Sequence, residues 1–238
     1  MKLKPIRTIS AILIALSLVG TAATAAPASA ANARYITISA TGTTTVVPDA
    51  VRITASVSVL DASSKAALAG AGATSNAVRA ALSANKVGAK DIATQSISVF
   101  PEYSYSSTGV QTLTGYRATQ SFDITVRAAS SAGAVVDAIV EAGGDNLQVN
   151  GASPFVLDNN KATQKARAFA VARAKVKAAS YAKLLGIKLG RVIYLDETST
   201  PSTYPIYTTA AKGDSAATVV DLGEQKVSVS VTVRWAIG

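Results

Sequence analysis

The sequence predicts an α+β fold in which helices pack on one face of antiparallel sheets, with the element order β-β-α-β-β-α-β-α-β-β. Three observations lead to this prediction. Apolar residues alternate with polar ones in residues 51–59 and 227–235, which is typical of strands with one buried and one wet face. One long Ala-rich stretch, residues 158–186, contains no Pro and no interior Gly. The other strand candidates come in pairs between helices, which favours helices layered on antiparallel sheet.

The first 30 residues have the pattern of a secretory signal peptide. Lys2, Lys4 and Arg7 make a basic start, residues 9–19 are apolar, and residues 28–30 form a small-residue cleavage motif. The apolar stretch is much shorter than the roughly 20 residues that cross a bilayer. We therefore expect cleavage near Ala30, no transmembrane segment in the mature chain, and a secreted protein that is either extracellular or periplasmic.

Composition narrows the chemistry that the chain can perform. Removal of the three basic residues of the signal peptide would lower the formal net charge from +9 to +6. An exported protein of this charge meets anionic lipids and wall polymers rather than nucleic acid. The chain contains no Cys and no His. Disulfides and thiol chemistry are therefore excluded, and the commonest general base and metal ligand is missing.

The remaining elements follow from local patterns. Further strands are expected at residues 35–40, 95–105, 122–126, 147–157 and 191–196, and shorter helices at residues 62–86 and 131–142. Gly70 and Gly72 weaken the first half of the first of these helices. We expect a tight connection at residues 42–49, a polar hairpin tip at residues 106–112, and an extended surface loop at residues 198–221.

The long helix has a marker at each end. Asp158 is predicted to be its N-cap, and Gly186 is predicted to close it in the left-handed conformation. Between them a row of small side chains predicts a face that lets the helix axis come close to a sheet. That row consists of Ala162, Ala166, Ala170, Ala174, Ala178, Ala182 and Leu185, with Phe169, Val176 and Tyr181 on its flanks.

Several short motifs follow one another in an order that belongs to a known family. They are Gly42 with VPDA at residues 47–50, DIAT at 91–94, PEYSY at 101–105, GYRA at 115–118, FVLD at 155–158, the Ala-rich residues 166–179, LG at 185–186 and 189–190, and GEQ at 223–225. On these residues the chain resembles the SIMPL-domain family of exported bacterial proteins, which includes periplasmic immunogenic proteins. The resemblance covers residues 36–235 and implies that residues 31–238 form a secreted or periplasmic α+β domain. It also implies a link with stress responses and, in some members, self-assembly, without a known catalytic centre.

No catalytic, cofactor or metal site is predicted. Ser83 and Lys86 match S-x-x-K, but the companion motifs are missing, so a helix end with a solvated Lys is favoured. Asp196 and Glu197 would point to opposite faces of a strand and cannot flank one substrate bond. Around Asp145 there are too few carboxylates for a calcium loop.

Two surface features are candidates for binding. Basic residues of the long helix could attract anionic lipid or wall polymer, but their spread around the exposed arc favours a solvated face. Tyr103 and Tyr105 share a strand face, with Tyr116 expected across the hairpin, and cross-strand packing is favoured over a partner site. Tyr204 and Tyr207 lie in the late loop. The basic set is Lys161, Lys165, Arg167, Arg173, Lys175, Lys177 and Lys183.

The sequence predicts a non-catalytic exported protein. It is predicted to act by forming a homo-oligomer or by binding an unidentified envelope protein, in the cell envelope or in a stress response. Two alternatives stay open: an electrostatic binder of anionic envelope polymers or lipid, and an unrecognised hydrolase. No cofactor and no nucleic acid partner are expected.

Overall fold

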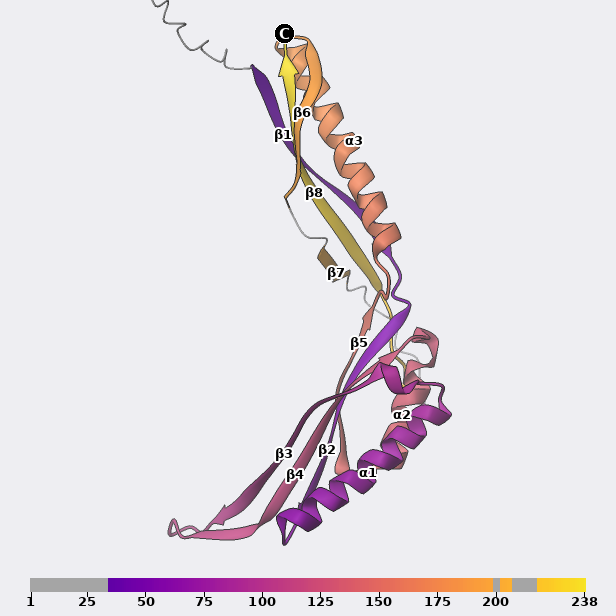
Figure 1. Ribbon diagram of the computed structural model, residues 1–238, viewed down its shortest axis with the longest axis vertical. Coiled ribbons are helices and arrows are strands. Elements are labelled where there is room, and N and C mark those ends of the chain that lie inside the picture. Colours follow the sequence, from indigo (N-terminus) through magenta and orange to yellow (C-terminus); the bar gives the residue numbers. More distant parts are fainter. Residues whose placement is uncertain (1–33, 199–201, 207–217) are drawn as a thin grey trace, which may run out of the picture. The chain divides into compact units, whose positions relative to one another are not determined.

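The computed structural model describes residues 34–198, the backbone of residues 202–206, and residues 218–238. In this part of the chain, two four-stranded antiparallel sheets and three α-helices are present (Figure 1). The helices and strands confirm the α+β class and the predicted element order, with one additional strand. The predicted signal peptide lies outside the described residues.

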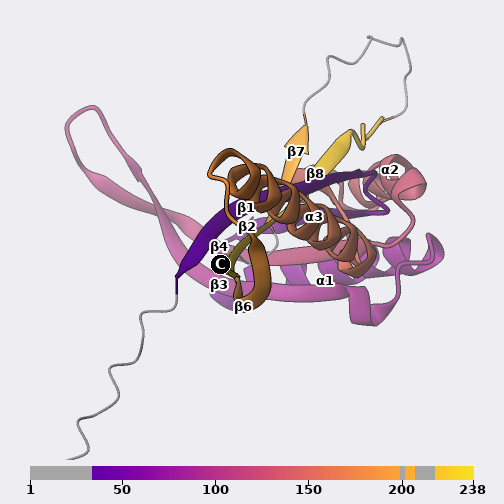
Figure 2. The same cartoon turned by 90° about the horizontal axis from the view of Figure 1, so that it is seen from above.

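The first sheet, here called the α3 sheet, has β8 at its centre. Its elements are β1 (Tyr35–Val46), β6 (Leu189–Glu197), β7 (Ser202–Ile206), β8 (Glu224–Ile237) and α3 (Asn160–Leu184). β1 pairs with β8 along its full length, from Tyr35 opposite Ala236 to Val46 opposite Gln225. β6 and β7 also pair with β8. α3 runs along one face of β1 and β8, as both cartoon views show (Figures 1 and 2).

The second sheet, here called the α1–α2 sheet, has the strand order β3-β4-β2-β5. Its elements are β2 (Ala50–Asp61), β3 (Ile92–Tyr105), β4 (Gln111–Val126), β5 (Leu147–Phe155), α1 (Ser64–Ala84) and α2 (Ala132–Gly143). Short 3₁₀ turns connect these elements at η1 (Ala89–Asp91), η2 (Ala129–Ser131) and η3 (Gly144–Asn146). The order of the strands and helices again follows the prediction.

α3 buries the row of alanines that the sequence predicted. All six from Ala162 to Ala182 are buried, and the five from Ala162 to Ala178 pack with alternate residues of β8. The buried β8 residues are Val227, Val229, Val231, Val233 and Trp235. A row of i, i+4 steps slants across an α-helix by about 26°, and strands twist, so a slanted row can follow a twisted strand pair.

Gly42 lets α3 come into backbone contact with β1. A Cβ at this position would lie 2.0 Å from the carbonyl oxygen of Ala166 and 2.3 Å from the backbone nitrogen of Ala170. The expectation of a tight connection at residues 42–49 is therefore wrong for its first half, because β1 continues to Val46 and only residues 47–49 join it to β2. The glycine serves a close approach of two backbones rather than a turn.

The ends of α3 differ in part from the prediction. Gly186 has φ +64°, so the left-handed closure is confirmed. Asn159 is the N-cap, and the carboxylate of Asp158 accepts a hydrogen bond from the Asn160 N–H (2.8 Å), so the Asp158 prediction is wrong by one residue. Leu185 is 64% exposed and does not belong to the buried row. A step of three residues from Ala182 leaves the slanted row, and Leu185 already follows the last helical residue.

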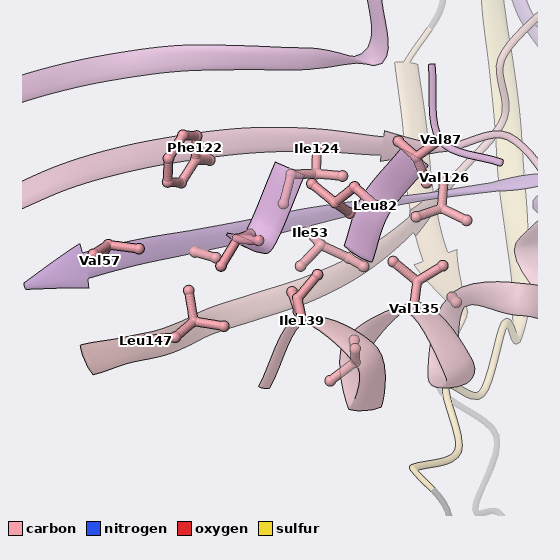
Figure 3. Packing of buried hydrophobic residues seen from close by; sticks show 14 of the residues in the cluster. Ile53, Val57, Leu82, Val87, Phe122, Ile124, Val126, Val135, Ile139 and Leu147 are labelled. Atoms are coloured by element: carbon pink, nitrogen blue, oxygen red, sulfur yellow. The ribbon is translucent and has the colours of Figure 1, made fainter. Parts of the chain in front are cut away.

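The α1–α2 sheet buries its own core under both helices (Figure 3). Alternate residues of β2 and β4 point into it, as the sequence predicted for β2. Phe122, Ile53, Leu82, Ile124 and Ile139 are its largest fully buried side chains. α1 is continuous despite its two glycines, and the Ser63 side chain accepts a hydrogen bond from the Ala66 N–H at its start.

The expected surface loop at residues 198–221 contains a strand. Residues 202–206 form β7, whose backbone pairs with Ser228 to Glu224 of β8. The Thr, Ser and Pro content that suggested a loop did not reveal this pairing, because a short edge strand needs only an open partner strand. Residues 199–201 and 207–217 of the expected loop lie outside the described residues.

Substitution of Gly42 by Ala is expected to lower the free energy of unfolding by about 3 kcal/mol or more. The added methyl group meets backbone atoms of α3, which cannot rotate away. Gly72→Ala is the matched control, since a Cβ there has no atom within 4 Å and the helix gains about 0.5–1 kcal/mol. Urea unfolding of both variants checks this. Equal stabilities would contradict the close packing of α3 on β1.

Candidate interaction surface

The hairpin of β3 and β4 extends beyond the strand that supports it. β2 ends with Asp61, which lies opposite Tyr116 of β4. The pairs of β3 and β4 between this point and the hairpin tip therefore have no third strand beside them. We call this segment, residues 102–115, the hairpin arm (Figure 1). Residues 106–110 form its tip, close to the predicted one. A two-stranded ribbon exposes both faces, so its side chains cannot all be buried within this chain.

Large apolar side chains of this hairpin face solvent. Phe100 is 66% exposed, Tyr105 70% and Val110 60%. Tyr103 and Leu113 are also exposed and lie directly opposite each other. Side chains at alternate positions share a strand face, so Tyr105 belongs to the same face as this pair. Exposed apolar side chains gathered on one element are a common mark of a contact site.

The tyrosines do not form the cross-strand cluster that was favoured from the sequence. Tyr103 and Tyr105 share a face as predicted, but Tyr116 lies opposite Pro101, and it packs against the core of the α1–α2 sheet. A shift of register between Glu102 and Tyr103 separates Tyr116 from the other two. Nothing is described of the Tyr204 side chain, and Tyr207 lies outside the described residues.

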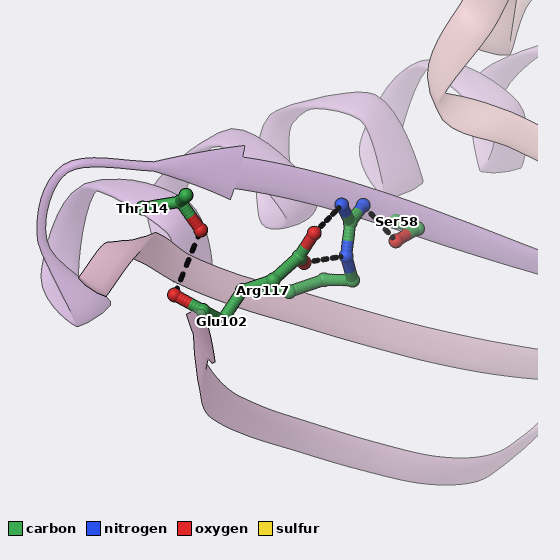
Figure 4. A network of polar contacts seen from close by, with 4 residues as sticks. All are labelled: Ser58, Glu102, Thr114 and Arg117. Atoms are coloured by element: carbon green, nitrogen blue, oxygen red, sulfur yellow. Dashed lines mark hydrogen bonds and ion pairs between the residues drawn. The ribbon is translucent and has the colours of Figure 1, made fainter. Parts of the chain in front are cut away.

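A polar network holds the base of the arm (Figure 4). The Arg117 guanidinium donates to both carboxylate oxygens of Glu102, one of them at 2.9 Å, and to the Ser58 hydroxyl at 3.2 Å. The Thr114 hydroxyl donates to the Glu102 carbonyl at 2.7 Å. The hydrogen bonds between Arg117 and Glu102 hold the pKa of Glu102 below its ordinary value of 4.5 and raise the pKa of Arg117. The network therefore fixes the place from which the arm projects.

Comparison with known proteins identifies the family. The sequence pattern of the SIMPL family, described as "Protein of unknown function (DUF541)", matches residues 36–235. The chain belongs to the SIMPL family. It is also 31% identical over 159 residues to 26 kDa periplasmic immunogenic proteins of Brucella melitensis biotype 1 and Brucella abortus (strain S19). The match covers 62% of this chain and 62% of each relative.

In this SIMPL chain one acid of the adjacent pair in β6, Glu197, has a structural role. The Arg167 guanidinium of α3 donates to both carboxylate oxygens of Glu197, at 2.6 and 3.0 Å. Asp196 lies opposite Thr232 and Glu197 opposite Val231, so the two acids occupy adjacent positions with opposite orientation. A similar pair, Asp91 with Arg127, joins η1 to the segment after β4.

Three of the seven basic side chains of α3 are used inside the molecule. Besides Arg167, Arg173 donates from Nη1 to the Thr41 carbonyl at 2.8 Å, and Lys177 Nζ lies 3.4 Å from the Ser39 carbonyl. Both carbonyls belong to β1. The sequence could not show these contacts, because they depend on how closely α3 lies to the edge of β1. Only Arg167 is neutralised by a carboxylate, whereas Arg173 and Lys177 keep their charge at the edge of β1.

The other sequence candidates do not assemble into a site. Ser83 lies in the last turn of α1, and the Lys86 N–H donates to the Ser83 carbonyl just after the helix end. Within the residues that the structure describes, no group of three or more acidic side chains is arranged to hold a metal ion. Among the described helices, none has both the length and the apolar character needed to cross a bilayer.

Replacing Arg117 by Gln is expected to raise the pKa of Glu102 towards 4.5. Because the folded pKa lies below that value, the ion pair stabilises the fold above about pH 4.5. This contribution is lost as the pH falls through the lower folded pKa. Carboxyl ¹³C NMR titration measures the shift, and Arg191→Gln in β6 serves as the charge-matched control. An unchanged Glu102 titration in Arg117→Gln would show that the network does not form in solution.

Proposed function

We propose that this SIMPL protein is exported and acts without catalysis, by associating with itself or with a protein partner in the cell envelope. The observation that carries this proposal is the hairpin arm with its exposed apolar side chains. Tyr103, Tyr105 and Leu113 project from this arm with much of their surface in solvent, so another surface can cover them. Burial of one such side chain contributes about 1.5–3 kcal/mol, so a few of them suffice for specific contact.

Two further facts support an envelope location. The relatives from Brucella carry the name periplasmic immunogenic protein. Residues 1–30 have the sequence pattern of a secretory signal peptide, with cleavage expected near Ala30. The proposed place of action is therefore outside the cytoplasm, and the family resemblance suggests a role in the response to envelope stress.

The absence of Cys and His from the whole sequence supports a non-catalytic role. Without these residues, nucleophilic catalysis relies on Ser, Thr, Tyr, Lys or a carboxylate with an activating group in reach. Three carboxylates, those of Asp91, Glu102 and Glu197, are instead held in ion pairs with arginines. Contact with another protein uses none of these groups and fits the exposed arm.

The double substitution Tyr105→Ser with Leu113→Ser is expected to weaken self-association or partner capture at least about tenfold, which corresponds to 1.4 kcal/mol. Light scattering over a concentration series measures self-association of the mature protein, and co-purification from the native envelope measures partner capture. Val140→Ser on α2 removes an exposed apolar side chain elsewhere and is the matched control.

A strict monomer at all concentrations would remove the self-association half of the proposal. If the arm variant also recovered the same partners as the wild type, in the same amounts, the arm would not be the contact surface. Loss of association in Val140→Ser to the same extent would contradict the proposal as well, because it would show a nonspecific effect of surface hydrophobicity.

A further inference from the structure

β1 is an open edge of the α3 sheet. In the part of the chain that the structure describes, it pairs with β8 on one side only. Two side-chain contacts show which β1 residues direct their backbone groups to the open side. The hydroxyl oxygens of Ser39 and Thr232 lie 2.8 Å apart, and so do those of Thr41 and Ser230. Such close side-chain approach is typical of pairs that are not hydrogen-bonded in an antiparallel ladder. Residues of these pairs point their backbone N–H and C=O groups away from the neighbouring strand.

The contacts of α3 confirm this orientation independently. Arg173 and Lys177 reach the carbonyls of Thr41 and Ser39 from outside the sheet. By alternation, the backbone of Thr37 and Thr43 faces the same way. The open edge of β1 therefore presents a row of N–H groups at every second residue, with basic side chains resting on two of the carbonyls between them.

A groove runs along this edge, between β1 and the exposed flank of α3. Its wider part has a volume of about 630 Å³, and an adjoining part has about 460 Å³. Lys177 lines both parts, and together they lie along β1 from Ile36 to Thr41. The α3 side is largely apolar. Its apolar residues are Ala172, Val176, Tyr181 and Leu185, and Arg173, Lys177 and Ser180 lie among them.

We propose that the open edge of β1 and this groove bind an extended acidic segment of a partner protein, which adds a strand to the α3 sheet. A strand backbone supplies carbonyls at the two-residue spacing of the β1 N–H groups. Alternate side chains of the segment share the face that turns towards α3, where apolar ones enter the groove. Carboxylates at positions on this same face take donors of Arg173 and Lys177, because each of these side chains makes only one hydrogen bond to β1.

The positive charge at the β1 edge favours an acidic partner segment over a second copy of this chain. Two β1 edges paired about a two-fold axis would bring Arg173 and Lys177 of both copies to one interface, where like charges repel. The net charge of the chain is also positive. An acidic strand meets complementary charge instead. The basic side chains over the edge also discourage neutral strands from pairing there, which is a common protection of edge strands.

The test uses the peptide acetyl-Val-Thr-Glu-Thr-Glu-Thr-Val-amide, whose Val and Glu side chains share one strand face, and the full mature protein in ¹⁵N NMR titrations. Binding is expected to shift the amides of Thr37, Ser39, Thr41 and Thr43. The same peptide with Lys in place of Glu is expected to bind at least about tenfold more weakly. A peptide with N-methylated backbone amides, which cannot complete the strand pairing, is expected not to bind.

Variants then show which basic side chains bind the acidic peptide. Arg173→Gln with Lys177→Gln is expected to weaken acidic-peptide binding at least about tenfold, while Lys175→Gln with Lys183→Gln, on the same helix with the same charge change, is expected to leave it within about twofold. Tyr105→Ser with Leu113→Ser is expected to keep full peptide binding, so failure of the hairpin arm and failure of this site remain distinguishable. Circular dichroism verifies that each variant is folded.

Three results would overturn the proposal. The first is equal binding of the acidic, basic and N-methylated peptides, or no binding of the acidic one. The second is a dimer of the free protein in which the β1 amides are already protected from exchange, since the occupant would then be a second copy. The third is displacement of the peptide by anionic phosphatidylglycerol vesicles that shift the same amides, since the edge would then serve a lipid surface.

Discussion

The backbone contact between α3 and β1 is the constraint on which the α3 sheet depends. Small side chains on both sides permit it: the buried alanines of α3 and Gly42 of β1. Because the helix lies so close, arginine and lysine side chains on its flank reach over the edge strand to its carbonyls. The same closeness leaves the larger flanking residues without cover, and these residues line the groove. The close packing of α3 on β1 therefore determines both the buried core of the α3 sheet and the groups exposed at its edge.

The two surfaces proposed for contact are exposed for different physical reasons. The hairpin arm lacks a third strand, so its apolar side chains are left in water, while the bonds of Arg117 to Glu102 and Ser58 keep its base in place. Among the described residues, β1 has no neighbouring strand on its open side, and the charged side chains of Arg173 and Lys177 lie over its backbone groups. An arm of this kind favours contact by apolar burial, whereas the edge favours a partner that brings both a strand and negative charge.

Much of the fold could be predicted from the sequence, because periodicity reports directly which side chains are buried. The alternation in β8 and the alanine row of α3 are examples. What failed were features that depend on distances between elements. A glycine required by a close approach, Gly42, has the same local signature as a turn glycine. The roles of Arg173 and Lys177 follow from their distance to the β1 edge, and β7 exists because β8 offers it a partner. The tyrosines of the arm were noticed, but their exposure depends on where β2 ends.

We propose that this SIMPL protein works through contact of specific surfaces with other proteins. Site-specific photo-cross-linking in the native envelope tests it most directly, with a photoreactive amino acid placed at Tyr105 in the arm, at Val176 in the groove, and at Val140 as a control surface. We expect discrete protein adducts from Tyr105 and Val176 and none from Val140. Absence of adducts from both of the first two positions, or the same adducts from all three, would contradict it.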